Sequence, residues 1–163
     1  YDGMKKVHGM GKRERFLLQL SVILQDCGKF ISMTNVGECS YSIIMNTEMI
    51  GLSHQEREIV ANVVRFNHGK FVYYEELSRN SVMDRAAYLI IAKLTAILRL
   101  AGGLERTDKE NSRKIKVQLK DNKLMIVLDG EQDVLYEQEG FAGKADFFGE
   151  VYSLEPVVVR KNV

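Results

Sequence analysis

The sequence predicts a mainly α-helical bundle followed by a small α+β unit with a short sheet. Apolar residues recur at helical spacing in long windows before residue 105, whereas the last third holds short alternating segments. Only one proline, Pro156, occurs in the chain, so little in the sequence interrupts a helix. The 45% share of apolar residues, with 23 basic and 22 acidic residues, is typical of a soluble globular domain.

Helices are expected near residues 13–27, 39–49, 54–67, 74–79 and 82–103. The first carries Phe16, Leu20, Ile23 and Cys27 at i, i+4, i+7 and i+11, which predicts one buried stripe. Because nearly every turn of the last helix is apolar on all sides, this helix is expected to be the buried centre of the bundle. Its apolar residues include Leu89, Ile90, Ile91, Leu94, Ile97 and Leu98.

Two helix starts carry capping signals. Ser53 followed by Glu56 is a capping box, in which the hydroxyl and the carboxylate each satisfy a backbone N–H group. Ser81 with Asp84 repeats the signal before the last helix. An apolar face follows the first of these boxes and is formed by Ile59, Val60, Val63 and Phe66.

The second unit is expected to hold strands near 114–120, 123–129 and 155–160 and a helix near 141–152. Asp121-Asn122 joins the first two strands, as in a hairpin turn. Residues 133–139 are compatible with either a strand or a helix. A polar run over residues 105–112 places the boundary between a first domain at residues 1–107 and a second at residues 108–163.

Composition excludes several classes of protein. A net charge of +1 gives no general attraction to nucleic acid or phosphate, so polyanion binding must come from local patches. No stretch approaches the ~18–20 continuous apolar residues of a membrane span, and no membrane partner is expected. Two cysteines, Cys27 and Cys39, are too few for a disulfide framework, so a cytoplasmic location is expected. The start at Tyr1 suggests a fragment of a longer protein.

Familiar catalytic motifs are missing from the sequence, including phosphate-binding glycine loops, nucleophile elbows and paired metal-binding histidines. The three histidines, His8, His54 and His68, stand far apart, and the favoured interpretation is that each is a surface or helix-end residue. No catalytic residue is therefore assigned within this chain.

One segment, Leu24-Gln25-Asp26-Cys27-Gly28-Lys29-Phe30-Ile31, resembles the Leu-His-Asp-Ile-Gly-x-x-Ile motif of HD-type phosphohydrolase domains. Further motifs follow at residues 39–46, 51–58, 64–67, 97–101 and 141–152. In this order and spacing the chain resembles the C-terminal, HD-like domain of the exopolyphosphatase / guanosine-pentaphosphate phosphatase family. The resemblance implies an HD-like helical bundle with a small C-terminal α/β unit.

The resemblance also implies that a metal site of HD type has been lost. Gln25 takes the place of the motif histidine and leaves Asp26 nearly alone. The other positions that the family fills with metal ligands are Gly37, Cys39, Asn67, Gly102 and Glu105. One carboxylate cannot hold a catalytic divalent ion firmly, so this domain is expected to contain no metal and no cofactor.

In the resembled family, hydrolysis belongs to an actin-like pair of N-terminal domains, and the parent enzyme is expected to need a divalent cation such as Mg²⁺. The implied role of this domain is to help bind polyphosphate or a similar phosphate polyanion and to contribute to a homodimer. A polyanion needs lysines, arginines and helix N-termini along a groove.

Two basic clusters are candidates for this role. The anion-binding residues predicted from the sequence are Lys5, Lys6, Lys12, Arg13, Arg15, Arg65, His68 and Lys70. A third run on the hairpin, with Arg113, Lys114, Lys116, Lys120 and Lys123, is interpreted as solubilising charge on a strand.

Two alternative functions remain open at this point. One is a metal-dependent HD-type nucleotide phosphohydrolase with an atypical ligand set, which would use Asp26, Glu38, His68 and Glu105. The other is a purely structural dimerisation domain, with an apolar interface formed by Ile43, Ile44, Met45, Met49 and Ile50.

Overall fold

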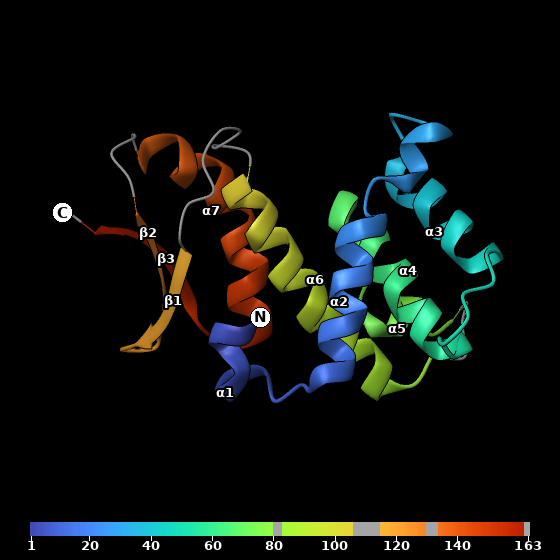
Figure 1. Ribbon diagram of the computed structural model, residues 1–163, viewed down its shortest axis with the longest axis horizontal. Helices are drawn as coiled ribbons and strands as arrows, with labels where there is room; N and C mark the ends of the chain where they lie inside the picture. Colours follow the sequence, from blue (N-terminus) through green and yellow to red (C-terminus); the bar gives the residue numbers. More distant parts are fainter. Residues whose placement is uncertain (80–82, 106–114, 130–133, 162–163) are drawn as a thin grey trace. The chain divides into compact units, whose positions relative to one another are not determined.

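The computed structural model describes residues 1–79, 83–105, 115–129 and 134–161 (Figure 1). The elements are η1 (Asp2–Met4), α1 (Lys5–His8), α2 (Lys12–Leu24), η2 (Cys27–Phe30), α3 (Val36–Asn46), α4 (His54–His68), α5 (Tyr74–Leu77), α6 (Arg85–Glu105), β1 (Ile115–Lys120), β2 (Lys123–Asp129), α7 (Val134–Tyr152) and β3 (Glu155–Lys161). The predicted fold class, mainly α with a short C-terminal sheet, is confirmed.

The chain forms two compact units, each described by itself. The helical unit comprises residues 10–95, and the sheet unit comprises residues 1–9 together with residues 96–163. Helix α6 contributes to both. The predicted domain boundary at 107/108 lies in residues 106–114, outside the described residues, and stays a prediction.

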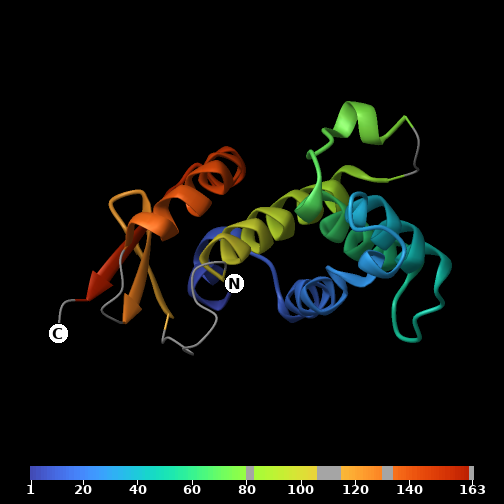
Figure 2. The same ribbon diagram turned by 90° about the horizontal axis from the view of Figure 1, so that it is seen from above.

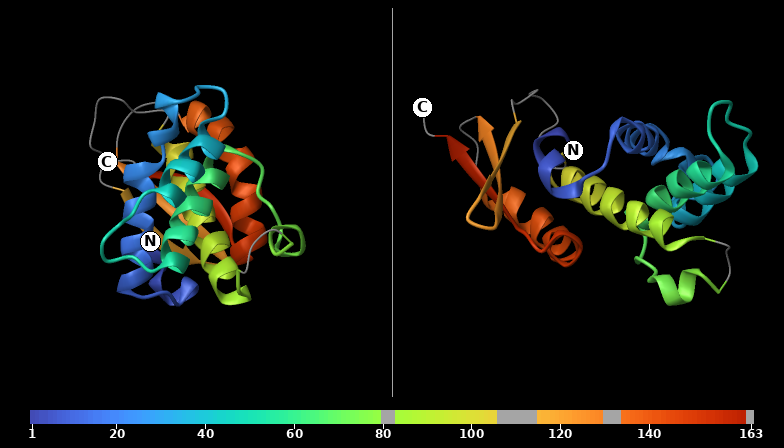
Figure 3. Two further views of the ribbon diagram at one scale, coloured as in Figure 1. Left: turned by 90° about the vertical axis from the view of Figure 1, so that its right-hand side faces the viewer. Right: turned by 90° about the horizontal axis from the view of Figure 1, so that it is seen from below.

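Helix α4 is the centre of the helical unit and packs against α2 and α3 (Figures 1 and 3). The predicted capping box is confirmed, because Ser53 Oγ accepts from Glu56 N at 3.2 Å and Glu56 Oε2 accepts from Ser53 N at 2.8 Å. The predicted apolar face is also confirmed. Its residues Ile59, Val60, Val63 and Phe66 are all buried.

The stripe predicted for the first helix is wrong. Phe16 is 40% and Ile23 is 75% exposed, whereas the buried residues of α2 are Leu17, Leu18 and Ser21. Because apolar residues occur around most of this helix, more than one stripe fits its spacing. Packing against α4 determines which of these stripes is buried. The spacing of residues within α2 carries no information about that contact.

Helix α6 begins at Arg85, three residues after the predicted start at residue 82. Asp84 Oδ1 accepts from Ala87 N at 2.7 Å, so Asp84 itself is the N-cap, while Ser81 lies outside the described residues. Ile91 and Leu94 are buried as predicted, but Leu89 is 54% exposed, which corrects the expectation of burial on all sides. Residues 85–104 are long and apolar enough to cross a membrane, a test that buried core helices also pass.

The sheet unit has the strand order β1-β2-β3, antiparallel between β1 and β2 and parallel between β2 and β3. Asp121 and Asn122 have φ of 50° and 60°, as a two-residue type I′ hairpin turn requires. Helix α7 connects β2 to β3 and lies along one face of the sheet (Figure 2). It begins at Val134, so the ambiguous segment 133–139 is helical from residue 134 onward.

The first nine residues belong to the sheet unit, where η1 packs against β1. The approach is close, since a Cβ added to Gly3 would lie 2.7 Å from Val117 Cβ. His8 ends α1 but is only 1% exposed, and its Nε2 lies 3.1 Å from the carbonyl oxygen of Tyr1. The prediction that each histidine lies at the surface or at a helix end is therefore confirmed: His8 is a buried helix end, and His54 and His68 are the exposed ends of α4.

Candidate anion-binding site

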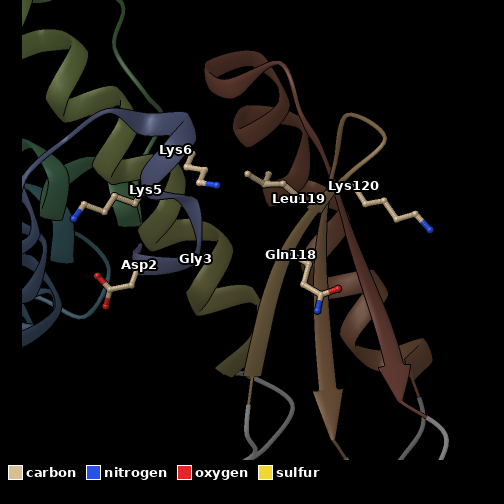
Figure 4. A pocket seen from close by; sticks show the side chains of 7 residues that line it. All are labelled: Asp2, Gly3, Lys5, Lys6, Gln118, Leu119 and Lys120. Carbon is tan, nitrogen blue, oxygen red and sulfur yellow. The ribbon is translucent and has the colours of Figure 1, made fainter.

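A groove runs between the N-terminal segment and strand β1 within the sheet unit. It has a volume of about 830 Å³ and is lined by Asp2, Gly3, Lys5, Lys6, Gln118, Leu119 and Lys120 (Figure 4). Lys5 and Lys6 come from the first turn of α1, and the last three lining residues are consecutive on β1. More than 110 residues of sequence separate the two walls.

Lysine dominates the charge of this groove. Figure 4 shows Lys6 extended toward β1, facing Leu119, while the ammonium groups of Lys5 and Lys120 point outward on either side. Within the described ranges none of these three lysines forms an ion pair, and Asp2 is the single acidic residue of the lining. Of these three charges, that of Lys6 therefore points into the groove, and those of Lys5 and Lys120 lie on either side of it.

The other basic residues near the N-terminus belong to the helical unit. Arg13 is held by Glu56, with Nε–Oε1 at 2.6 Å and Nη2–Oε2 at 2.8 Å, and its Nη2 also donates to Gly51 O at 2.6 Å. Lys12 is exposed and Arg15 is half-buried. Because Nε and Nη2 of Arg13 donate to Glu56 and Gly51, this residue is better suited to joining α2 to the start of α4 than to holding an anion.

This ion pair predicts a pH dependence of stability. The hydrogen bond from Arg13 is the largest cause that lowers the pKa of Glu56, from its ordinary value of 4.5 to about 2. A lowered folded-state pKa stabilises the fold above pH 4.5, and this contribution is lost as the pH falls toward 2. We expect Arg13→Ala to lower the free energy of unfolding near pH 7, by an amount that shrinks between pH 5 and pH 2.

The measurement is urea unfolding followed by circular dichroism at several pH values. Lys12→Ala is the matched control, since this neighbouring cation has no ion-pair partner among the described residues. If the loss in unfolding free energy caused by Arg13→Ala stayed constant from pH 7 to pH 2, the stabilising role of the Arg13–Glu56 ion pair would be contradicted.

A second, smaller pocket of about 320 Å³ lies in the helical unit, at the start of α3. Its lining is Met33, Thr34, Asn35, Val36, Gly37, Glu38, Arg65, His68 and Gly69. Arg65 Nε bonds Glu38 Oε1 at 2.6 Å, and its guanidinium lies 5.1 Å from the ring centre of Tyr41. Lys70 is exposed and is not part of the lining. The positive charge of Arg65 is thus largely compensated within the fold.

Four polar residues meet beside this pocket. Asn67 Nδ2 donates to Gln25 Oε1 at 3.2 Å, across 42 residues of sequence. His68 Nε2 lies 2.6 Å from Gln25 O and 3.4 Å from Asp26 Oδ1. Asp26 also pairs with Lys29 at 2.8 Å. The alternative ligand set had grouped His68 with Asp26, and the two do approach each other, because the turn after α2 lies beside the end of α4.

These residues do not fit a catalytic metal ion. Gln25 and Asn67 offer neutral amides that bond each other, and a lysine ammonium occupies one oxygen of Asp26. Nowhere in the described part of the chain do three or more His, Cys, Asp or Glu residues converge as metal ligands would. Of the alternative ligand set, Glu38 bonds Arg65, and the side chain of Glu105 lies outside the described residues.

The lining of the groove was only partly predictable. Lys5 and Lys6 were predicted as anion-binding residues, whereas Lys120 was assigned to solubilising charge and Asp2 and Gln118 were not singled out. No local pattern signals the groove, because it depends on packing of the N-terminal segment against a distant hairpin. The alternation of β1 does not signal the groove either, because Val117 and Leu119 share the face toward the N-terminal segment, whereas Lys116, Gln118 and Lys120 lie on the other face.

Comparison with known proteins agrees with this architecture. A model of the protein family described as Ppx/GppA phosphatase, domain III, matches residues 2–141. The matched range includes the helical unit, the N-terminal segment, the β1–β2 hairpin and the beginning of α7. A search of curated proteins found no match. Because the family model covers most of its length, this chain belongs to the Ppx/GppA phosphatase family and corresponds to domain III of those proteins.

Proposed function

We propose that this domain is an accessory part of an exopolyphosphatase-type phosphatase that binds polyphosphate, or a similar phosphate polyanion, along the groove between α1 and β1. The observation that supports this is the row of three lysines without ion-pair partners among the described residues, Lys5, Lys6 and Lys120. The domain is not catalytic by itself. In this proposal, N-terminal actin-like domains of a cytoplasmic parent enzyme hydrolyse the polymer with a divalent cation such as Mg²⁺, and the domain adds contacts to a homodimer.

The spread of the lysines favours an extended polyanion over a single phosphate group. A tight site for one phosphate needs donors that converge, with arginine or a helix N-terminus supplying directed hydrogen bonds. Lys5 and Lys120 instead point outward on either side of Lys6, as separate point charges. Such charges can each neutralise a different phosphate of a chain and release its counterions, which makes binding depend on salt.

The groove lysines can be tested by charge removal. We expect Lys5→Ala combined with Lys6→Ala to weaken binding of long-chain polyphosphate by roughly tenfold at low salt, since each lost contact costs about 0.7 kcal/mol or more. The matched control is Lys29→Ala with Lys123→Ala, which removes two charges that are already paired with Asp26 and Glu155.

Isothermal titration of each variant at two salt concentrations would measure the effect. The control should stay within about twofold of the wild type, and orthophosphate should compete poorly with the polymer. Equal losses in the two double variants would mean that net charge, and not this groove, determines binding.

A further inference from the structure

Strands β2 and β3 carry apolar residues on both of their faces. β2 reads Lys-Leu-Met-Ile-Val-Leu-Asp and β3 reads Glu-Pro-Val-Val-Val-Arg-Lys, whereas β1 alternates apolar residues with lysine or glutamine. Continuous apolar runs are typical of strands that are buried on both faces, and alternation is typical of a strand with one face in water. The sequences of β2 and β3 therefore indicate that something covers each of their two faces.

One of these faces is covered within the sheet unit. Leu124 and Ile126 of β2 point to it and are 2% and 3% exposed. Val117, which pairs with Ile126, meets Gly3 on the same face. Helix α7 and the N-terminal segment both lie on this side (Figures 1 and 2). The described part of the sheet unit places no helix on the opposite face, which we call the outer face.

Four apolar residues form the centre of the outer face. Met125 pairs with Val157, and Val127 pairs with Val159. These residues alternate along their strands with those of the covered face, so they point outward, and all four are half-buried. Together they form a continuous strip across β2 and β3, called the apolar strip below.

Strand β1 borders the apolar strip with positive charge. Lys116 pairs with Val127 across the hairpin, and Lys120 follows on the same face. Both lysines are exposed, and neither forms an ion pair among the described residues. At the turn end of the strip, Lys123 pairs with Glu155 at 2.9 Å and adds no net charge. The outer face is therefore apolar over β2 and β3 and cationic over β1.

This division fits an amphipathic helix with acidic residues beside its apolar stripe. Helices cover sheets by laying such a stripe on an apolar face. Lys116 and Lys120 lie about 13 Å apart along β1, at about 3.3 Å per residue. Two turns of a helix span about 11 Å, so acidic residues two turns apart can each reach one of these lysines.

Other classes of partner fit the outer face less well. Single-stranded nucleic acid binds by stacking bases on aromatic rings, and the described residues of this face include no aromatic ring. A membrane surface is bound by aromatic or apolar side chains that protrude into the lipid. The residues of the apolar strip are half-buried in a flat sheet, so they cannot be inserted in this way.

The apolar interface expected from the sequence in the helical unit does not offer a comparable face. Ile44 is completely buried, and Ile43, Met45 and Met49 are half-buried. Of that set Ile50 alone is fully exposed, at 106%, and a single exposed apolar residue is ordinary.

We propose that the outer face binds an amphipathic helix of another polypeptide, whose apolar stripe covers the apolar strip and whose acidic residues pair with Lys116 and Lys120. The proposal goes beyond the proposed function and does not depend on it. Because Lys120 also lines the groove, the charge on the outer face is tested at Lys116, which is not part of the groove lining.

Two labelled synthetic peptides of about 18 residues, or five helical turns, test this proposal by fluorescence anisotropy at low salt. Both carry leucines at i, i+3, i+4 and i+7, and the residues beside this stripe are glutamates in one peptide and lysines in the other. We expect the glutamate peptide to bind at least tenfold more tightly than the lysine peptide. Equal binding of the two peptides, or no binding of the glutamate peptide, would overturn the proposal.

Substitutions then locate the bound peptide. Lys116→Glu and Val157→Lys should each raise the dissociation constant of the glutamate peptide roughly tenfold, by charge reversal and by a charge placed in the apolar strip. The matched control is Lys12→Glu, the same charge reversal at an exposed lysine of the helical unit, which should change the constant less than about twofold. An equal effect of Lys116→Glu and Lys12→Glu would contradict the assignment to the outer face.

Two further measurements complete the test. Thermal unfolding of each variant checks that it is folded. Lys5→Ala with Lys6→Ala, which removes charge from the groove, should leave peptide binding within about twofold of the wild type, so this proposal and polyphosphate binding can fail separately. Binding to phosphatidylserine vesicles without binding to the glutamate peptide would assign the outer face to a membrane and overturn the proposal.

Discussion

Replacing Gly28 with alanine is expected to lower the free energy of unfolding of the helical unit by roughly 3 kcal/mol. A Cβ at this position would lie 2.4 Å from Val36 O and 2.5 Å from Ser40 N, and both of these atoms belong to the backbone of α3. A flexible side chain could move aside, but a helix backbone cannot without loss of its own hydrogen bonds. The close approach of η2 to α3 therefore requires glycine.

The same substitution elsewhere gives the controls. At Gly69 an added Cβ would meet its nearest atom at 3.5 Å, so Gly69→Ala should change stability little. At Gly143, inside α7, nothing lies within 4 Å, and Gly143→Ala should stabilise by up to about 1 kcal/mol through helix propensity. Urea unfolding followed by circular dichroism would rank the three variants by their free energy of unfolding. A Gly28→Ala protein as stable as Gly69→Ala would refute the tight contact.

Truncation of Phe148 is expected to have the largest effect on the sheet unit, about 3–5 kcal/mol for Phe148→Ala. The side chain is completely buried on α7, and its ring centre lies 4.7 Å from that of Tyr152. Its loss leaves a cavity that the surrounding side chains cannot fill by small movements.

The neighbouring Phe147 is the matched control for this change. Phe147 is only half-buried, and the guanidinium of Arg99 lies 4.9 Å from its ring centre, so Phe147→Ala should cost less than half as much. Thermal unfolding measures both variants. Because β1 belongs to the same unit as Phe148, the groove should disappear together with that unit, and polyphosphate binding should be lost at the temperature where the sheet unfolds.

Helices and strands were predictable where a few neighbouring residues determine where the element begins or turns. The capping box of α4 and the Asp121-Asn122 turn act within four residues, and both are found as expected. The strands follow because alternation with period two and the turn together determine the register. The buried stripe predicted for α2 was wrong because no local signal selects it. Helix α2 is apolar on several sides, and the side that is buried is the one that packs against α4.

The candidate site was less predictable because long-range packing creates it. The cluster predicted over residues 5–15 is divided between the two compact units, with Lys5 and Lys6 in one and Arg13 in the other. Arg13 and Arg65 are both neutralised by carboxylates that lie 43 and 27 residues away. Lys120 reaches the groove from the hairpin instead. Counting charges along the sequence finds basic residues but not which of them remain unpaired.

Nuclear magnetic resonance most directly tests where the polyanion binds. Long-chain polyphosphate is added to ¹⁵N-labelled protein at low salt, and the amide shifts are compared with those in orthophosphate. We predict the largest shifts at Gly3, Lys6 and Leu119, which line the groove, and their reversal as salt is added. Shifts centred on Asn35 and Arg65 at the smaller pocket, or no shifts at any residue, would contradict the assignment of the groove.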